Sequence, residues 1–297
     1  MIALLLGLDS STEMRIANSM WGHQSFTLEQ AFIDAGKTFF DAEVSTLDFA
    51  SPTAVTTIND WVSQKTNKRI PTLLDEISPD EVLFLINAIY FKGRWRDAFE
   101  RDETRPAPFY TAAGTTRTAQ LMSQTDSLLY QETAEYQAVD LLYGNGAFTM
   151  TVLLPQPGHT PAELLGVMTA ETWRELAGRF QPQEIHLVLP RFRLEYSRKL
   201  AEDLIRLGMG IAFDDSRADF YRIADVRPNR LYLTRVDQKT FVDVNEEGTE
   251  AAAATAVGVG LISAPPSMVV DRPFVFAIRE RLSGTVVFLG VMNVVGE

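Results

Sequence analysis

The chain has 297 residues, no cysteine, three scattered histidines and a formal net charge of -12. The missing cysteines exclude disulfide bonds and a thiolate nucleophile, and the scattered histidines argue against a histidine-rich metal site. The acidic balance argues against nucleic acid or an anionic membrane as a partner, and a length of this kind suits one large domain or two ordinary ones.

The first residues contain a short apolar run. No apolar run in the sequence reaches the roughly 18–20 residues of a membrane span. Residues 1–8 lack the basic start and the cleavage site of a signal peptide. We therefore expect these residues to be the end of a buried helix. The mixed apolar run that follows predicts a strand within residues 9–22.

Two helices and a strand are expected next. Residues 28–40 place apolar side chains at helical spacing, with acidic residues early, and predict a helix. Residues 42–49 are strand-like. Residues 53–66 predict a second helix with Ile58 and Val62 on one face.

Residues 82–95 contain a continuous apolar run of strand length, with one polar residue, Asn87, in its middle. Such a run is typical of a strand that is buried on both faces. A buried amide needs hydrogen-bond partners, so Asn87 should link neighbouring strands. The alternative is an ordinary core asparagine whose hydrogen bonds are satisfied.

The second half of the chain predicts strands, turns and helices without internal repeats or linkers. They are, in order, strands and turns over 110–190 with a turn at 141–146, a strand at 148–155, a helix at 160–179, a strand at 185–192, a helix at 197–208 that glycine ends, a strand at 231–244, and strands at 271–278 and 286–290 joined by a turn at Ser283-Gly284.

Residues 246–257 have almost no side-chain bulk and read Glu-Glu-Gly-Thr-Glu-Ala-Ala-Ala-Ala-Thr-Ala-Val. Alanine favours a helix, and the glycines and prolines of residues 258–266 favour an exposed loop. The run also fits a segment small enough to enter a sheet. In a strand, Thr249, Ala251 and Ala253 would share one face, and Glu250 would point toward water.

The sequence has only incomplete matches to known catalytic motifs. Gly36-Lys37-Thr38 lacks the first glycine of a phosphate loop, and Gly258-x-Gly260 lacks the third glycine of a dinucleotide fingerprint. The sequence has neither a Gly-x-Ser-x-Gly elbow nor a His-Glu-x-x-His motif. We therefore do not expect an enzyme, a cofactor or a metal.

The alanine-rich run at residues 246–256 resembles the hinge of the serpins, the loop-inserting protease inhibitors, in the form that inhibitory members have. Further strings resemble the family in the same order along essentially the whole chain. They are Ile16-Ala17-Asn18, residues 58–62 and 66–70, Asn87 with Trp95, Phe99, Thr104 and Phe109, residues 189–192, and the two C-terminal strands.

This resemblance implies an α+β fold with a large central mixed β-sheet, further sheets, about six to eight helices and an exposed reactive loop near the C-terminus. Residues 1–297 would form a single domain, with residues 246–266 as hinge and loop. A complete serpin has further helices at its start, so we expect an N-terminally incomplete domain. The usual shutter histidine of the family falls on Gln238.

The resemblance also implies roles for individual residues. Asn87 and Gln238 fall at the shutter, where the sheet parts, and Trp95 falls at the breach, where the loop enters. Arg191 and Glu246 match a breach ion pair. The inserting hinge consists of Glu246, Glu247, Gly248, Thr249, Glu250, Ala251, Ala252, Ala253, Ala254 and Thr255, and the reactive bond, counted from Gly248, is Ile262–Ser263.

We therefore expect a suicide inhibitor of serine proteases. The branched apolar Ile262 favours an elastase-like or subtilisin-like target, and a register shift of one would place Leu261 there and favour a larger pocket. We expect a monomer that is extracellular rather than cytoplasmic, although no signal peptide is visible at this start. The alternative is a non-inhibitory binding or scaffold protein of the same fold, or an inactive fragment.

Overall fold

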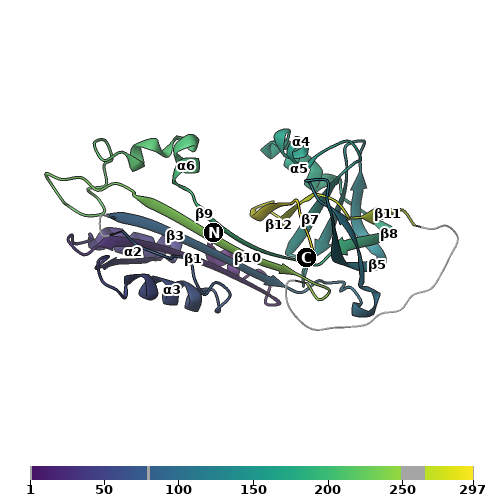
Figure 1. The fold of residues 1–297 in the computed structure, drawn as a ribbon, viewed down its shortest axis with the longest axis horizontal. Coiled ribbons are helices and arrows are strands. Elements are labelled where there is room, and N and C mark those ends of the chain that lie inside the picture. The colour runs from purple at the N-terminus through teal and green to yellow at the C-terminus, as the bar shows by residue number, and fades with distance from the viewer. Residues whose placement is uncertain (1, 79–80, 249–264, 297) are drawn as a thin grey trace.

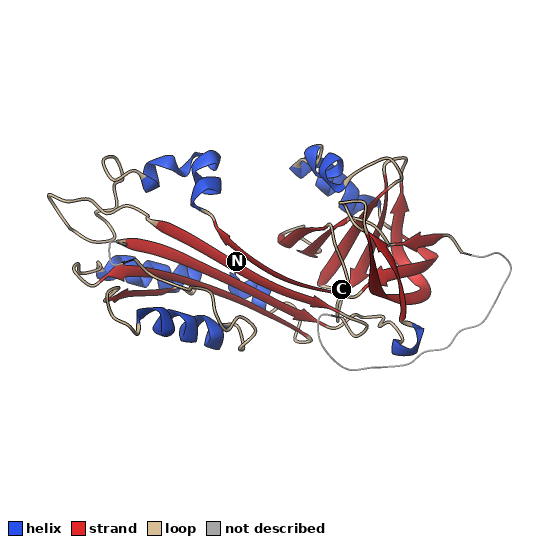
Figure 2. Cartoon of the chain, in the orientation of Figure 1, coloured by secondary structure: helices blue, strands red, loops and turns tan. Residues whose placement is uncertain are grey.

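The computed structural model describes residues 2–78, 81–248 and 265–296. These residues form two β-sheets with several short helices packed around them (Figures 1 and 2). A five-stranded sheet occupies one end of the molecule, and an eight-stranded sheet occupies the other (Figure 1). This arrangement confirms the predicted α+β class.

The five-stranded sheet has the strand order β2, β1, β3, β10 and β9. β3 pairs antiparallel with β1 and parallel with β10. Because β3 and β10 run in the same direction, both end at the same edge of the sheet. In sheet order, the five strands span Glu43–Leu47, Thr12–His23, Leu83–Gly93, Arg235–Val244 and Phe192–Lys199.

The two faces of β3 differ in burial. One face packs against α3 (Ala54–Lys65) in a hydrophobic cluster that includes Ile86 and Tyr90, which are 2% and 1% exposed. Leu85, Asn87 and Ile89 point to the other face and are half-buried. The prediction that this strand is buried on both faces is therefore wrong, because a continuous apolar sequence does not require two covering layers.

The eight-stranded sheet holds the largest part of the hydrophobic core. Its order is β11, β8, β5, β6, β7, β12 and β13, and β4 pairs with β5. Every residue of β7 and β12 is buried. From β4 to β8 the strands span Arg105–Tyr110, Thr116–Glu132, Tyr136–Leu142, Phe148–Pro155 and Gln181–Pro190, and β11 to β13 span Ser267–Val269, Phe274–Glu280 and Val286–Met292.

The helices lie around the sheets, with α3 and α6 on opposite sides of the five-stranded sheet (Figure 1). In the described ranges, no helix has the length and apolar character needed to cross a membrane. Besides α3, the α-helices are Ile2–Leu6 (α1), Gln30–Phe40 (α2), Pro161–Gly166 (α4), Ala170–Arg179 (α5) and Ala201–Leu204 (α6). The remaining helical turns, of 3₁₀ or π type, span Arg101–Glu103 (η1), Ile205–Met209 (η2) and Gly210–Phe213 (η3).

The predicted helix over 160–179 is two helices. Thr169 is the N-cap of α5, and its hydroxyl accepts a hydrogen bond from the Thr172 backbone N–H at 3.2 Å. A capping box of this kind satisfies the free N–H groups of a new helix start. The sequence pattern therefore continues across residues 167–169, but the helix does not.

Two other predictions are wrong. Residues 197–199 extend β9, because they pair with β10, and only the four residues of α6 follow as α-helix. Gly208 lies at a φ of 99°, beyond α6 and inside η2. The N-terminal helix is not buried, since Leu4 is 67% exposed.

Candidate functional site

The segment after β10 is fixed to the end of β3. The Trp95 N–H donates to the Glu247 carbonyl, and the Phe99 N–H donates to the Glu246 carbonyl, both at 2.9 Å. Gly248 forms an isolated bridge with Arg94. The hinge therefore begins at the edge where β3 and β10 both end.

Gly248 fits this position because it has no side chain. Its φ is 126°, which L-residues rarely adopt. A Cβ would lie 2.2 Å from the Gly93 carbonyl oxygen and 2.6 Å from the Trp95 nitrogen. Both are backbone atoms and have little freedom to move aside.

We expect Gly248→Ala to destabilise the folded chain by about 1–3 kcal/mol, the usual cost of a strained backbone position. Thermal unfolding would show this as a lowered Tm. The control is Gly178→Ala in α5, where an added Cβ meets nothing within 4 Å. That change should be neutral or stabilising by up to about 1 kcal/mol. Equal Tm shifts for the two variants would contradict the close approach seen at Gly248.

Trp95 and Glu246 hold the first part of the hinge. The Trp95 indole Nε1–H donates to the Asn245 carbonyl at 2.9 Å, and its ring stacks on Tyr143 with centroids 4.4 Å apart. Glu246 Oε1 accepts hydrogen bonds from the Thr104 hydroxyl and the Arg191 guanidinium. We call Trp95, Thr104, Arg191 and Glu246 the hinge clamp.

The hinge clamp changes the ionisation of Glu246. Burial alone would raise the pKa of this carboxyl group, but hydrogen bonds from Thr104 and Arg191 outweigh that effect and lower it. The Glu246 side chain is 3% exposed, so the carboxylate of its ion pair with Arg191 is shielded from water. Glu247 makes a second, more exposed ion pair with Arg101.

We expect the hinge clamp to weaken in acid. Because the folded pKa of Glu246 lies below its ordinary value of 4.5, its ionised form stabilises the folded chain above that pH. This stabilisation is lost as the pH falls through the lowered pKa. Urea unfolding should show Glu246→Gln about 1–3 kcal/mol less stable than the wild type at pH 7.

The same comparison near pH 3, below the ordinary carboxyl pKa, should show a smaller difference. A difference of equal size at both pH values would mean that the charge of Glu246 does not contribute.

Three amide side chains form a second group, which we call the amide row. Asn87 Nδ2 donates to Asn18 Oδ1 at 2.9 Å, and Gln238 Nε2 donates to Asn87 Oδ1 at 3.0 Å. Both partners lie directly beside Asn87 in the strand register. Asn87 therefore links β1, β3 and β10 across the middle of the sheet.

The two groups are separate along the same strand. From Asn87 to Gly93, a strand covers about 20 Å at about 3.3 Å per residue. The hinge clamp lies at the end of β3, and the amide row lies at its centre. Within the described ranges, no cluster of three or more histidine or acidic side chains is arranged to hold a metal ion.

Part of the predicted site lies outside the described residues. This part is the inserting hinge from Thr249 to Thr255 and the bond Ile262–Ser263. The chain is described again from Pro265, and the Pro266 carbonyl accepts a hydrogen bond from the His186 N–H at 2.9 Å. The two ends of this stretch are therefore fixed to different sheets.

Sequence reasoning did not assign roles to Asn18, Arg101, Thr104 and Tyr143. Asn18 stands in a string that resembles the family, and its position as the only amide in an apolar strand was a usable signal. Nothing in the sequence pairs Arg101 with Glu247 or Tyr143 with Trp95. Those contacts depend on how the two sheets meet.

Comparison with known proteins identifies the family. The model of the family "Serpin (serine protease inhibitor)" matches residues 1–294. The chain is a serpin. Its sequence is 34% identical to the human leukocyte elastase inhibitor over 294 residues, which cover 93% of this serpin and 76% of that protein.

Solved structures agree on the fold. Native tengpin, a thermophilic serpin, has a TM-score of 0.90 at 27% identity, covering 98% of this serpin and 76% of that chain. Human thyroxine-binding globulin also has a TM-score of 0.90, covering 100% of this serpin and 79% of that chain. At 24% identity, that likeness concerns the fold alone.

Proposed function

We propose that this serpin inhibits a serine protease as a suicide substrate. The observation that supports this proposal is that the hinge begins where the parallel strands β3 and β10 both end. A chain that turns back there and enters between them would run antiparallel to both. One parallel ladder would then become two antiparallel ladders, which are slightly more stable per residue.

The proposed reaction starts with ordinary protease chemistry. The serine of the target attacks the carbonyl carbon of Ile262, the bond to Ser263 breaks, and an acyl-enzyme forms on the Ile262 carbonyl. The segment from Gly248 to Ile262 is then free at one end. At about 3.3 Å per residue, its insertion would carry the bound protease roughly 50 Å.

Moving the protease this far would distort its active site against the body of the serpin. Deacylation needs an intact oxyanion hole, and losing one donor there costs about 2.7–4 kcal/mol in transition-state stabilisation. The acyl-enzyme then persists. Insertion must therefore be faster than hydrolysis for trapping to succeed.

Hydrogen bonds alone do not drive the insertion. Each added ladder bond contributes about 0.5–1.5 kcal/mol, and ordering each loop residue costs about 1–2 kcal/mol. These contributions nearly cancel. We infer that the intact chain is metastable, and that the surplus comes from strain released elsewhere when the sheet expands.

The amide row is the barrier that must open first in this mechanism. Separation of β3 from β10 breaks the hydrogen bond between Gln238 and Asn87. Glutamine has no proton to gain or lose near neutral pH, unlike a histidine. We therefore propose that the separation of β3 from β10 at Gln238 does not respond to pH between about 5 and 8.

The proposed target class follows from Ile262. A branched apolar side chain fits the small or medium apolar pocket of elastase-like and subtilisin-like proteases. The similarity to the leukocyte elastase inhibitor supports this class. We also propose that the serpin acts as a monomer, since each step uses a single chain.

Incubation with pancreatic elastase and with subtilisin, followed by a denaturing gel, tests the proposal. We expect a band that survives denaturation at the summed mass of the protease and the serpin. A protease whose catalytic serine is replaced by alanine is the control, and it should give no such band. Cleavage of the serpin without a covalent band would contradict inhibition.

The alternative is a non-inhibitory binding protein. The fold is compatible with this alternative, because thyroxine-binding globulin shares it with a TM-score of 0.90. Such a protein would be cleaved in its loop without trapping the protease. The same gel therefore separates the two functions.

A further inference from the structure

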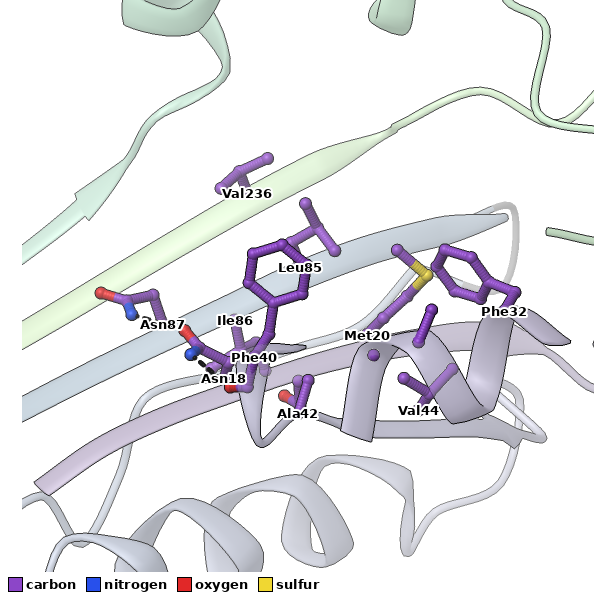
Figure 3. A pocket seen from close by; sticks show the side chains of 13 residues that line it. Asn18, Met20, Phe32, Phe40, Ala42, Val44, Leu85, Ile86, Asn87 and Val236 are labelled. Atoms are coloured by element: carbon purple, nitrogen blue, oxygen red, sulfur yellow. Dashed lines mark hydrogen bonds between the residues drawn. The ribbon is translucent and has the colours of Figure 1, made fainter. Parts of the chain in front are cut away.

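Asp9 lies in the chain between α1 and β1, close to the edge of the five-stranded sheet at which the hinge begins. Thr12, the first residue of β1, pairs with Gly93 at the end of β3. The amide row lies farther along the same two strands, where a hydrogen bond joins Asn18 and Asn87 (Figure 3). Asp9 is 5% exposed. No step of the proposed inhibition uses it.

The Asp9 carboxylate accepts three hydrogen bonds. Its Oδ1 accepts from the Ser11 N–H at 2.8 Å and from the Ser11 hydroxyl at 2.7 Å, and its Oδ2 accepts from the Asn145 N–H at 3.0 Å. Asn145 lies in the turn between β6 and β7, and its side-chain amide donates to the Leu8 carbonyl at 3.0 Å. A buried carboxyl group is stable only when such donors satisfy it. Asp9 therefore fixes the turn of residues 143–146 to the start of β1.

The same turn holds one peptide group at the end of β3. The Gly144 N–H donates to the Arg94 carbonyl at 2.9 Å. The N–H of this planar peptide group is that of Trp95, and it donates to the Glu247 carbonyl, also at 2.9 Å. The peptide group is therefore oriented by Gly144 on one side and holds Glu247 on the other.

The turn is also closely packed. Gly144 has a φ of 41°, and a Cβ there would lie 1.8 Å from Ser11 Oγ and 2.4 Å from Asp9 Oδ2. Tyr143, the preceding residue, is fully buried and stacks on Trp95. Because close-packed interiors transmit strain, a displacement of the turn should reach Trp95 through both its backbone and its ring.

We propose that Asp9 is a positioning residue for the hinge. It sets the position of the turn, the turn orients the peptide group between Arg94 and Trp95, and that group holds Glu247 where the hinge begins. This support comes from the backbone and from the start of β1, so it is separate from the side chains of the hinge clamp. Hydrogen bonds that are linked in this way strengthen one another, and the removal of one member weakens the rest.

The consequence for trapping rests on the proposed function. If the cut segment enters between β3 and β10, its first residues pair at this edge, and a hinge that is already in place starts the new strand in register. A loosened hinge must first be ordered, which costs conformational entropy. Loss of Asp9 should therefore slow insertion, so that more of the acyl-enzyme hydrolyses before it is trapped.

Fluorine NMR of the chain labelled with 5-fluorotryptophan measures the environment of Trp95 without a protease. The chain has four tryptophans, and Trp95→Phe assigns the resonance. The fluorine shift depends on the packing around the ring, which here includes the stacked Tyr143. We expect Asp9→Ala to move the Trp95 resonance. Asp9→Asn should return it to the wild-type position, because an amide oxygen can still accept from the Asn145 N–H.

Asn59→Ala is the matched control. The Asn59 side chain also makes three hydrogen bonds to backbone groups, but its partners are Leu73 and Leu74 in the segment after α3. Its loss should lower the Tm, as Asp9→Ala does, and leave the Trp95 resonance in place. An unmoved Trp95 resonance in Asp9→Ala, or an equal movement in Asn59→Ala, would overturn the proposal.

Ser11→Ala is the second variant should Asp9→Ala fail to fold, since it removes only the hydroxyl that donates to Asp9. In that case it should move the Trp95 resonance, and a resonance that stays at the wild-type position would overturn the proposal.

The gel with elastase tests the consequence for trapping. We expect a weaker covalent band and more cleaved serpin for Asp9→Ala, and a band of wild-type intensity for Asp9→Asn. Equal bands together with a moved Trp95 resonance would overturn the consequence for trapping but not the positioning role. Absence of the band in the wild type as well would overturn the proposed inhibition, and the NMR measurement would still decide the role of Asp9.

Discussion

Thr249→Arg is expected to convert this serpin from an inhibitor into a substrate. Thr249 is the first residue after Gly248, whose backbone is fixed at the end of β3. Side chains of a strand alternate between its two faces. In an inserted strand, the Thr249 side chain would therefore share a face with Ala251 and Ala253 and enter the core. A buried guanidinium without a partner costs several kcal/mol.

The penalty falls on insertion and not on cleavage. Loop cleavage by elastase should proceed at the wild-type rate, while the covalent yield should fall by more than about tenfold, since 1.4 kcal/mol already equals a factor of ten. The matched control is Glu250→Arg, whose side chain would lie on the opposite face of an inserted strand and should leave trapping intact. Undiminished trapping by Thr249→Arg would show that this residue does not enter the sheet.

Ile262→Arg is expected to redirect the inhibitor. A trypsin-like protease has a carboxylate in its primary pocket, which an arginine would pair with and an isoleucine leaves unpaired. We expect the association rate constant to rise by at least about a hundredfold for trypsin and to fall for elastase, because specificity sites built on such a partner discriminate strongly. Progress curves with each protease measure both rates.

Leu261→Arg serves as the control for register. If Ile262–Ser263 is the cleaved bond, Leu261→Arg should gain little against trypsin. A larger gain from Leu261→Arg than from Ile262→Arg would place the reactive bond one residue earlier. It would leave the insertion mechanism itself unchanged.

The sequence predicted the positions of strands better than it predicted what packs against them or pairs with them. The apolar run at residues 82–95 contains β3, and residues 148–155 are β7. The prediction that β3 is buried on both faces was wrong, because an apolar sequence shows which residues avoid water but not which other elements cover the strand. The same limit applies to residues 197–199, where pairing with β10 overrides an amphipathic helix pattern.

Residues of the site could be predicted where the local stretch of sequence is enough to recognise them. Gly248 and the small residues after it are visible as a pattern, and Asn87 is conspicuous in an apolar strand. Arg101 and Asn18 were missed as partners because their contacts join positions 146 and 69 residues apart. Pairing at that separation is fixed by the tertiary fold.

The central claim is that the segment after Gly248 becomes a strand of the five-stranded sheet once its far end is cut. Thermal unfolding of the intact serpin and of the serpin cleaved in its loop tests this most directly. We predict a Tm higher by at least about 10 °C for the cleaved form, since a few added kcal/mol shift Tm by about 2–4 °C each in a chain of this size. A cleaved form that unfolds at the same temperature as the intact serpin, or below it, would contradict the account.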